Sequence, residues 1–207
     1  MIRPRDTILF QGDSITNAFR RPEEINNAFQ LGAGYALLIA ARQLLERPAD
    51  QLTFLNRGVS GDTVQKLADR WRADCLELRP TVLSILVGIN DTLAGTPLPE
   101  YTATYRELLQ TTRRELPAVR LVLCEPYALP CGLITPAHSA DLKLRQPVVR
   151  QLAAEFAATF VPLQAPFNAA AARTTPGDWA YDGVHATAAG FALIAREWLA
   201  QVERIQA

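Results

Sequence analysis

Ser14 stands where a nucleophilic serine could attack an ester. It follows the apolar stretch 7–10 in the segment Gly12-Asp13-Ser14, and Gly12 can end a strand sharply because it has no Cβ. Open α/β sheets place their ligands at the carboxyl ends of strands. The same residue types also make ordinary turns and helix caps, so the serine needs partners elsewhere in the chain before chemistry can be assigned to it.

A histidine must accept the serine proton, because a serine hydroxyl alone is a poor nucleophile. The chain has two histidines, and no acidic residue is placed to orient His138. His185 follows Asp182 by three residues, an offset that can put the carboxylate on one imidazole nitrogen and leave the other free. We therefore predict that Ser14, His185 and Asp182 form a catalytic triad.

Acyl transfer also needs hydrogen-bond donors around the oxygen that becomes negatively charged. Three donors are available: the backbone N–H of Ser14, the backbone N–H of Gly61 and the side-chain amide of Asn90. Taken singly, Gly61 is equally explained as a turn glycine and Asn90 as a loop residue that tolerates left-handed geometry. Together with the triad they predict an oxyanion hole.

Strand-like and helix-like segments alternate along the whole chain. The apolar stretches predict strands at 7–10, 52–56, 81–87, 119–124 and 159–161. The helical segments are 34–47, a helix opened by a capping box at 62–65 and closed by Pro80, 100–116, 141–158 with Pro147 kinking or interrupting it, 164–173 and 187–205. Loops are expected at 20–30, 88–99 and 125–139.

This alternation predicts a three-layer α/β/α sandwich with a parallel sheet of about five strands. Its length of 207 residues suits one domain over 1–207. The loops at Ser14, 58–61 and 88–90 each follow a predicted strand, so in a parallel sheet they meet at one edge. The predicted triad and donors therefore converge.

Composition excludes several classes of function. The chain has 21 basic and 21 acidic residues without long runs of one sign, so neither a nucleic acid nor a membrane surface is an expected partner. The odd number of cysteines (Cys75, Cys124 and Cys131), without a Cys-x-x-Cys pair, argues against a zinc site. The first residues lack the apolar segment of a secretory signal. We expect a cytoplasmic protein that uses no metal and no cofactor.

Four segments resemble the four motif blocks of the SGNH (GDSL) hydrolases, in the order of that family. They are Gly12-Asp13-Ser14-Ile15, Gly58-Val59-Ser60-Gly61-Asp62-Thr63, Gly88-Ile89-Asn90-Asp91 and Asp182-Gly183-Val184-His185. The resemblance implies a flavodoxin-like fold with Ser14 as nucleophile. It also implies that Gly61 and Asn90 are oxyanion donors and that Asp182 and His185 complete the triad.

Further segments are similar to the intracellular acetylxylan esterases of this family, among them Asn56-Arg57-Gly58 and Arg70-Trp71. That similarity implies a serine esterase that removes acetyl groups from acetylated xylo-oligosaccharides through an acyl-enzyme, and a homo-oligomer built from dimers. Asn17 is a departure, because that group often carries Asp there. A thioesterase or lysophospholipase acting on longer acyl chains is the alternative, and a non-catalytic carbohydrate-binding domain is a second one.

The three tryptophans have different expected roles. Trp71 and Trp198 fall on apolar helix faces and are expected in the core. Trp179 lies in the loop before Asp182, where it could stack on a sugar ring of the substrate or seal the loop onto the core.

Overall fold

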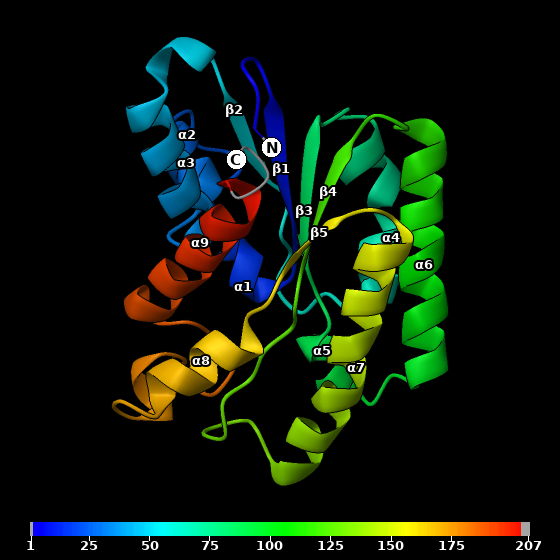
Figure 1. Cartoon of the computed structure of the whole chain (residues 1–207), viewed down its shortest axis with the longest axis vertical. Coiled ribbons are helices and arrows are strands. Elements are labelled where there is room, and N and C mark those ends of the chain that lie inside the picture. Colours follow the sequence, from blue (N-terminus) through cyan, green and yellow to red (C-terminus); the bar gives the residue numbers. More distant parts are fainter. Residues whose placement is uncertain (1, 204–207) are drawn as a thin grey trace.

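Five parallel strands form the sheet that the alternating pattern predicts (Figure 1). The structure, a computed structural model, describes residues 2–203. The strands lie in the order β2-β1-β3-β4-β5. Their bounds are β1 Thr7–Gly12, β2 Thr53–Asn56, β3 Val82–Leu86, β4 Arg120–Cys124 and β5 Thr159–Val161. Each strand lies within about two residues of its predicted range.

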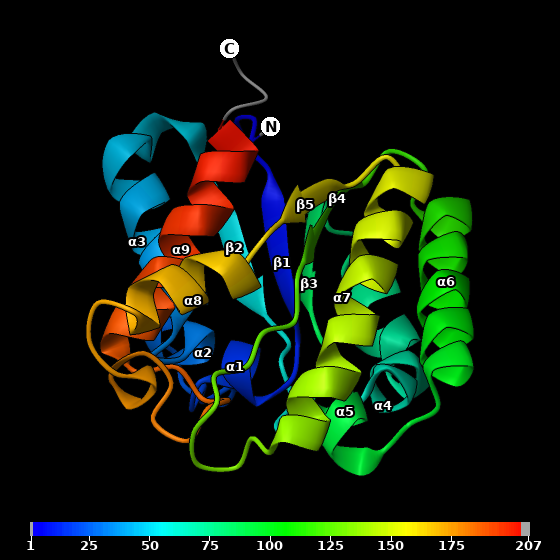
Figure 2. The ribbon, with the colours of Figure 1, turned by 60° about the horizontal axis from the view of Figure 1, so that its bottom comes forward.

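Helices cover both faces of the sheet, so the predicted α/β/α fold class is confirmed (Figures 1 and 2). One layer contains α2 Asn27–Leu31, α3 Tyr35–Glu46, α8 Gln164–Ala171 and α9 Ala188–Glu203. The other layer contains α4 Val64–Asp69, α6 Leu98–Glu115 and α7 Pro136–Glu155. No helix within residues 2–203 is both long and apolar enough to cross a membrane.

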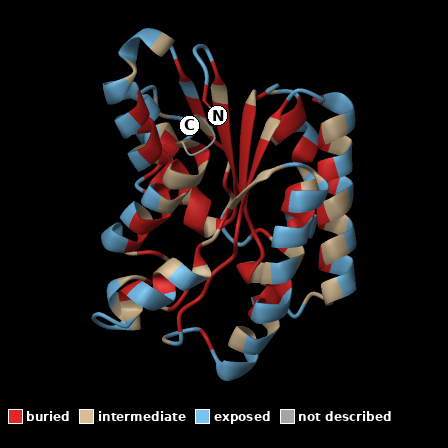
Figure 3. Cartoon of the chain, viewed as in Figure 1, coloured by how far each residue is buried: buried red, intermediate tan, exposed pale blue. Residues whose placement is uncertain are grey.

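Strand side chains alternate between the two apolar cores, as a parallel sheet covered on both faces requires. Ile8 and Phe10 pack under α3 and α9, whereas Leu9 points to the opposite layer. Figure 3 shows the buried residues concentrated along the strands and the inner faces of the helices. Trp198 and Trp71 are buried as predicted, and each indole N–H finds a hydroxyl partner, Ser84 and Thr112 respectively.

Two expected loops contain short helices. Segment 20–30 runs into α2, which begins after Asn26, whose side chain accepts the Ala28 N–H. Segment 88–99 contains α5 Ile89–Ala94, directly after β3. Both helices are too short to leave a periodic apolar pattern, which is why the prediction of loops was wrong there.

The predicted helix from 62 to Pro80 is interrupted at Arg70. α4 ends at Asp69, and a π-helical turn, Arg72–Leu76, follows. The N-cap of α4 is Thr63 rather than Asp62, because the Asp62 carboxylate accepts a hydrogen bond from Arg70 instead of capping the helix. The prediction of a capping box at 62–65 was therefore wrong, and the Thr63 hydroxyl instead accepts the Lys66 N–H as a simple cap.

The helix α7 begins earlier than predicted and is not interrupted. Thr135 caps it, and Pro136 occupies the first turn, where the missing N–H of proline costs nothing. Pro147 lies inside the helix without ending it. At the C-terminus α9 is described to Glu203, and the rest of the predicted range 187–205 lies outside the described residues.

Candidate active site

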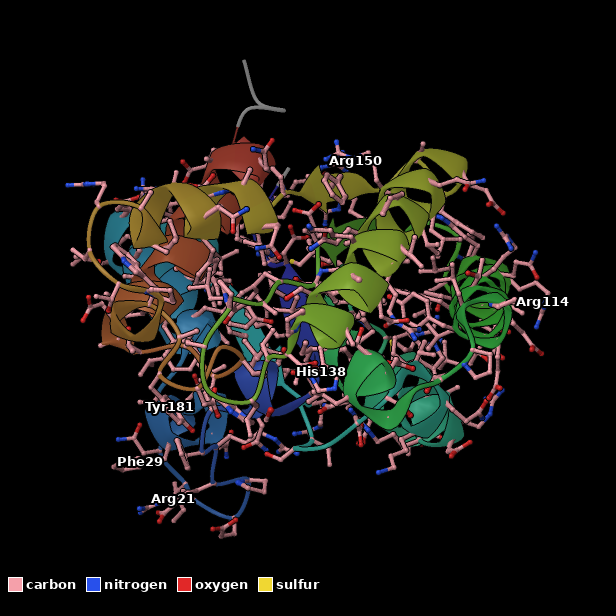
Figure 4. The ribbon with its side chains drawn as sticks, turned by 90° about the horizontal axis from the view of Figure 1, so that it is seen from below. Arg21, Phe29, Arg114, His138, Arg150 and Tyr181 are labelled. Carbon is pink, nitrogen blue, oxygen red and sulfur yellow. The ribbon has the colours of Figure 1, made fainter. Side chains whose placement is uncertain are left out.

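The site lies at the carboxyl edge of the sheet, below the strands in Figure 1 and facing the viewer in Figure 4. Ser14 is the first residue of α1 Ser14–Asn17, which follows β1 with only Asp13 between them. The Asp13 carboxylate caps this turn by accepting the Ile15 N–H at 2.9 Å. A Cβ on Gly12 would lie 2.2 Å from the Leu86 carbonyl oxygen of β3, so only glycine allows the strand to end here.

The structure brings Ser14, His185 and Asp182 into one hydrogen-bonded chain. Ser14 Oγ lies 2.9 Å from His185 Nε2, and His185 Nδ1 lies 2.7 Å from Asp182 Oδ2. Because a carboxylate accepts, this geometry puts the proton on Nδ1 and leaves Nε2 as the acceptor for the serine proton. His138 instead sits in the first turn of α7, where its ring contacts the Thr135 N–H and the Leu133 carbonyl.

The second carboxylate oxygen of Asp182 anchors its own turn. Asp182 Oδ1 accepts the backbone N–H groups of His185 at 2.8 Å and Val184 at 3.0 Å. Burial alone would raise the pKa of this carboxyl, but the two backbone donors and the imidazole outweigh burial and hold the pKa below its usual value. Asp182 is therefore held in its charged form beside the imidazole.

A loop over residues 125–135 holds the Asp182–His185 turn from behind. Leu129 N donates to the Gly183 carbonyl and Leu133 N to the Asp182 carbonyl, at 2.9 and 2.8 Å. The two backbones touch, since a Cβ on Gly132 would lie 2.5 Å from the Asp182 carbonyl oxygen. Tyr127 adds a hydrogen bond from its hydroxyl to the Val184 carbonyl. Sequence reasoning predicted a loop at 125–139 but not its role in holding this turn, because most of these contacts are between backbone atoms.

The predicted oxyanion donors come from two neighbouring loops. The Asn90 side-chain amide donates to the Asp62 carbonyl at 3.0 Å, so its position is tied to the residue after Gly61. Gly61 has a φ of +82°, and a Cβ built there would meet no atom within 4 Å. The Gly61 backbone therefore borders open space on the side where a side chain would lie.

Two buried carboxyls lie under these donors. Burial, aided by the neighbouring charges of Asp91 and Asp62, raises the pKa of Asp13 to about 7 against the opposing effect of the Ile15 N–H. Burial likewise raises the pKa of Asp91 to about 6, although the Val64 N–H and Arg145 act in the opposite direction. Asp91 accepts the Val64 N–H at 3.1 Å and so caps α4.

Sequence reasoning gave no role to Asn56 and Arg70, which connect the loops of the site. Asn56 is buried at the end of β2; its amide donates to the carbonyls of Thr16 and Leu31, and its oxygen accepts the Gly58 N–H. Arg70 reaches the end of β1 and the Asp62 carboxylate. The sequence did offer two signals for these roles. Asn56 is a polar residue at the end of a buried strand, and Arg70 is an arginine beside an apolar stripe.

Asn17, the departure from the acetylxylan esterase pattern, also joins two of these loops. Its amide nitrogen donates to the Gly58 carbonyl at 3.1 Å and its oxygen accepts the Phe19 N–H. A neutral amide suits this position, because a carboxylate could not donate to a carbonyl.

Two aromatic residues flank the triad. Trp179 is half-buried, packs against the core and donates its indole N–H to the Thr174 hydroxyl. Tyr181, labelled in Figure 4, is 62% exposed. Its ring stacks on the His185 imidazole at a centroid distance of 5.7 Å. Tyr181 was not singled out in the sequence, because nothing in its spacing indicates a contact with the imidazole.

Comparisons with known proteins show the family of this chain. Residues 10–193 match the model of the GDSL-like lipase/acylhydrolase family. An acetylxylan esterase of Geobacillus stearothermophilus is 32% identical over 95% of this chain and 94% of its own. The crystal structure of Axe2, an acetylxylan esterase of the same organism, has a TM-score of 0.85 and 30% identity over 97% of this chain and 96% of its own.

A protein of Parabacteroides merdae described as a GDSL-like lipase is 37% identical, with a TM-score of 0.88 and 98% of each chain covered. Similarity at this level spans the whole sheet and all four loops of the site. The chain is therefore a carboxylic ester hydrolase and belongs to the GDSL-like lipase/acylhydrolase family.

Proposed function

We propose that the protein is a serine esterase that removes acetyl groups from carbohydrate esters such as acetylated xylo-oligosaccharides. The observation that carries the proposal is the hydrogen-bonded chain from Ser14 through His185 to Asp182. It lies at the sheet edge where Asn90 and Gly61 offer N–H groups. The related Geobacillus esterase has been solved as catalytic mutants of a serine, an aspartate and a histidine, the same three residue types.

The reaction has two halves. Ser14 Oγ bonds to the acetyl carbonyl carbon while its proton passes to His185 Nε2, and the carbonyl oxygen becomes an anion held by the N–H groups of Ser14, Gly61 and Asn90. The bond to the sugar oxygen then breaks as His185 returns the proton to it. Water adds to the acyl-enzyme by the same steps, and acetate leaves. Asp182 stabilises the imidazolium in both halves.

The sugar part of the substrate would be met by the aromatic residues beside the triad. Trp179 remains our predicted platform, although its indole N–H is already paired, and Tyr181 presents the more exposed ring. Trp179→Ala and Tyr181→Ala are expected to differ: the residue that stacks on sugar raises KM for acetylated xylo-oligosaccharides and leaves KM for p-nitrophenyl acetate unchanged. If neither variant changes the oligosaccharide KM, no aromatic platform exists at these positions.

The nucleophile is tested by labelling and by turnover. A p-nitrophenyl phosphonate should release p-nitrophenol and add its phosphonyl group to the peptide that contains Ser14, as read by mass spectrometry. Ser14→Ala should lose both labelling and ester hydrolysis, whereas Ser139→Ala, on α7, should retain both. Unchanged turnover in a folded Ser14→Ala variant would exclude the proposed mechanism.

The acyl preference is tested with esters of graded chain length. Acetate esters should give the highest kcat/KM, and acetylated xylo-oligosaccharides should release acetate. A maximum at octanoate would favour the thioesterase or lysophospholipase alternative. Sugar binding without turnover of any ester would favour the non-catalytic alternative.

A further inference from the structure

Arg70 occupies a central position between the loops that carry the proposed donors. It lies in the break between α4 and the π-helical turn, and its side chain is only 18% exposed. A guanidinium carries five N–H donors in a planar fork, so one arginine can fix several acceptors relative to one another. In this site the acceptors belong to three different segments of the chain.

One set of contacts reaches the strand that leads to Ser14. Arg70 Nη2 donates to the Gly12 carbonyl at 3.3 Å, and Nη1 donates to the buried Gln11 side chain at 3.0 Å. Nη1 also donates to the Arg57 carbonyl at 2.7 Å, just after β2. The guanidinium therefore holds the ends of β1 and β2 in a fixed relation.

The second set of Arg70 contacts leads to the proposed oxyanion donors, Gly61 and Asn90. Arg70 Nε donates to Asp62 Oδ2 at 2.7 Å, and the Asp62 side chain is only 7% exposed. Asp62 directly follows Gly61, and its backbone carbonyl accepts the Asn90 amide at 3.0 Å. Asp62 is thus connected to two of the three proposed donors, by the chain to Gly61 and by a hydrogen bond to Asn90.

We infer that Arg70 is a positioning residue of the oxyanion hole, which holds Gly61 and Asn90 at a fixed place relative to Ser14 through Asp62. The inference rests on the proposed function. Without Arg70, the Asp62 carboxylate would be left buried without its cationic partner, and the loop would move to rehydrate it. Such a movement displaces both donors at once, although Arg70 itself touches no substrate.

Arg70→Gln is expected to lower kcat on p-nitrophenyl acetate by on the order of 10²-fold, the loss that a displacement of about 1 Å can cause. KM should change little, because the donors bind the charged oxygen of the transition state more strongly than the neutral carbonyl. A purely structural role would lower the melting temperature and the fraction of active enzyme, but kcat per active site, counted by phosphonate labelling of Ser14, would stay at the wild-type value.

A second measurement couples Arg70 to Asn90. Since Arg70 acts in part by placing the Asn90 amide, Arg70→Gln should cost much less in the Asn90→Ala background than in the wild type. Losses that simply multiply in the double variant would show that Arg70 does not act through this donor and would overturn the inference.

Two aspartates provide a matched pair of controls. Asp62 and Asp74 both accept hydrogen bonds from Arg70, but Asp74 lies on the π-helical turn and contacts no donor of the oxyanion hole. Asp62→Asn should lower kcat, while Asp74→Asn should leave it within about twofold of the wild type, because Asp74 contacts Arg70 but holds no donor in place. If Arg70→Gln does not fold, the comparison of Asp62→Asn with Asp74→Asn still tests the inference.

The outcomes separate this inference from the proposed function. If Ser14→Ala keeps its activity, the proposed function fails. If Ser14→Ala is inactive but folded Arg70→Gln keeps the wild-type kcat, or Asp62→Asn and Asp74→Asn behave alike, only the positioning role of Arg70 is overturned.

Discussion

Each proposed donor has a buried aspartate as its chain neighbour. Asp13 precedes Ser14, Asp62 follows Gly61 and Asp91 follows Asn90, and all three are less than 10% exposed. Three negative charges under an oxyanion would oppose its formation. Asp62 is neutralised by Arg70, whereas burial raises the pKa of Asp13 and of Asp91 so that both are partly protonated near neutral pH. The three carboxyls therefore shape their loops with less net negative charge than three unpaired carboxylates would carry.

At the residue scale, Asn90→Ala should remove about 2.7–4 kcal/mol of transition-state stabilisation, the usual cost of losing one oxyanion donor. The measurement is kcat on p-nitrophenyl acetate. Asn168→Ala on α8 should leave kcat unchanged. A loss of less than about tenfold in Asn90→Ala would show that this amide is not an oxyanion donor.

Asp13 makes stability depend on pH in an unusual direction. A carboxyl whose pKa is raised to about 7 binds its proton more tightly in the folded state than in the unfolded state. Its contribution to the free energy of unfolding is therefore fully present below pH 3.8, the ordinary value, and is lost as the pH rises towards about 7. Asp13→Asn keeps the oxygen that accepts the Ile15 N–H but cannot ionise.

We expect Asp13→Asn to gain stability relative to the wild type between pH 5 and pH 8, as read by urea unfolding at each pH. Ionisation of the buried Asp13 carboxyl weakens only the wild type over this interval. A constant difference between the two proteins would mean that Asp13 does not titrate here. Asp178→Asn is the control, because this exposed carboxyl has a lowered pKa, opposite to that of Asp13. It should not gain stability relative to the wild type over the same pH interval.

The sequence predicted which residues would meet but not what holds them. Ser14, Asp182 and His185 could be selected because their types and the Asp–His offset are chemically specific. Asn56 and Arg70 could not, because a buried amide or guanidinium acts through backbone carbonyls that have no sequence signature. The neighbours of a site are therefore harder to predict than the reacting groups.

At the scale of elements, the loop 125–135 fixes the base in place through contacts that tolerate no side chain. Gly183 has a φ of +85°, and a Cβ there would lie 2.4 Å from the Cys131 carbonyl oxygen. A side chain at position 183 would therefore both strain its own backbone and clash with the backbone of the neighbouring loop. Close approach of this kind stabilises the turn only while both segments carry glycine at the contact.

Gly183→Ala should therefore be more destabilising than a glycine replacement that adds strain alone. Gly95 provides the control, since its φ of +69° is similar but a Cβ there meets nothing within 4 Å. Gly95→Ala should cost roughly 1 kcal/mol and Gly183→Ala clearly more. Urea midpoints at one pH measure the difference, and equal costs would show that the 125–135 loop yields to the added methyl group.

Strands were predicted more accurately than helices for a physical reason. Buried parallel strands such as β3 are continuous apolar runs, which few other structures produce. The break at Arg70 was missed because the stripe from Val64 to Cys75 keeps helical spacing through it. The π-helical turn differs from a regular one by the hydrogen bond from Glu77 N to the Arg72 carbonyl, five residues back, and this bond has no signature in the apolar spacing.

At the scale of the molecule, several large apolar side chains are exposed to solvent on the single chain. Phe19 is 85% exposed, Ile25 99% and Leu45 81%. Phe19 and Ile25 belong to the same segment before α2, and contiguous exposed apolar groups commonly mark an interface. We propose a homo-oligomer built from dimers, as the resemblance to acetylxylan esterases implied.

Light scattering behind size exclusion should give an even multiple of the chain mass of 22.8 kDa. Replacement of Ile25 by aspartate should shift the mass downward if this loop lies in an interface, because burial of an unpaired charge is costly. Leu133→Asp, at a 52% exposed side chain on the loop 125–135, is the comparison. A mass of one chain at every concentration would exclude the oligomer.

The two halves of the proposed site are attached to the protein in different ways. Ser14, Gly61 and Asn90 follow strands of the central sheet, whereas the Asp182–His185 turn follows no strand and depends on the 125–135 loop. Local opening can therefore release the imidazole while the sheet stays intact. On gentle warming, hydrolysis should fade before the far-ultraviolet circular dichroism changes, and return on cooling: the enzyme would switch off reversibly at a temperature where it has not yet melted.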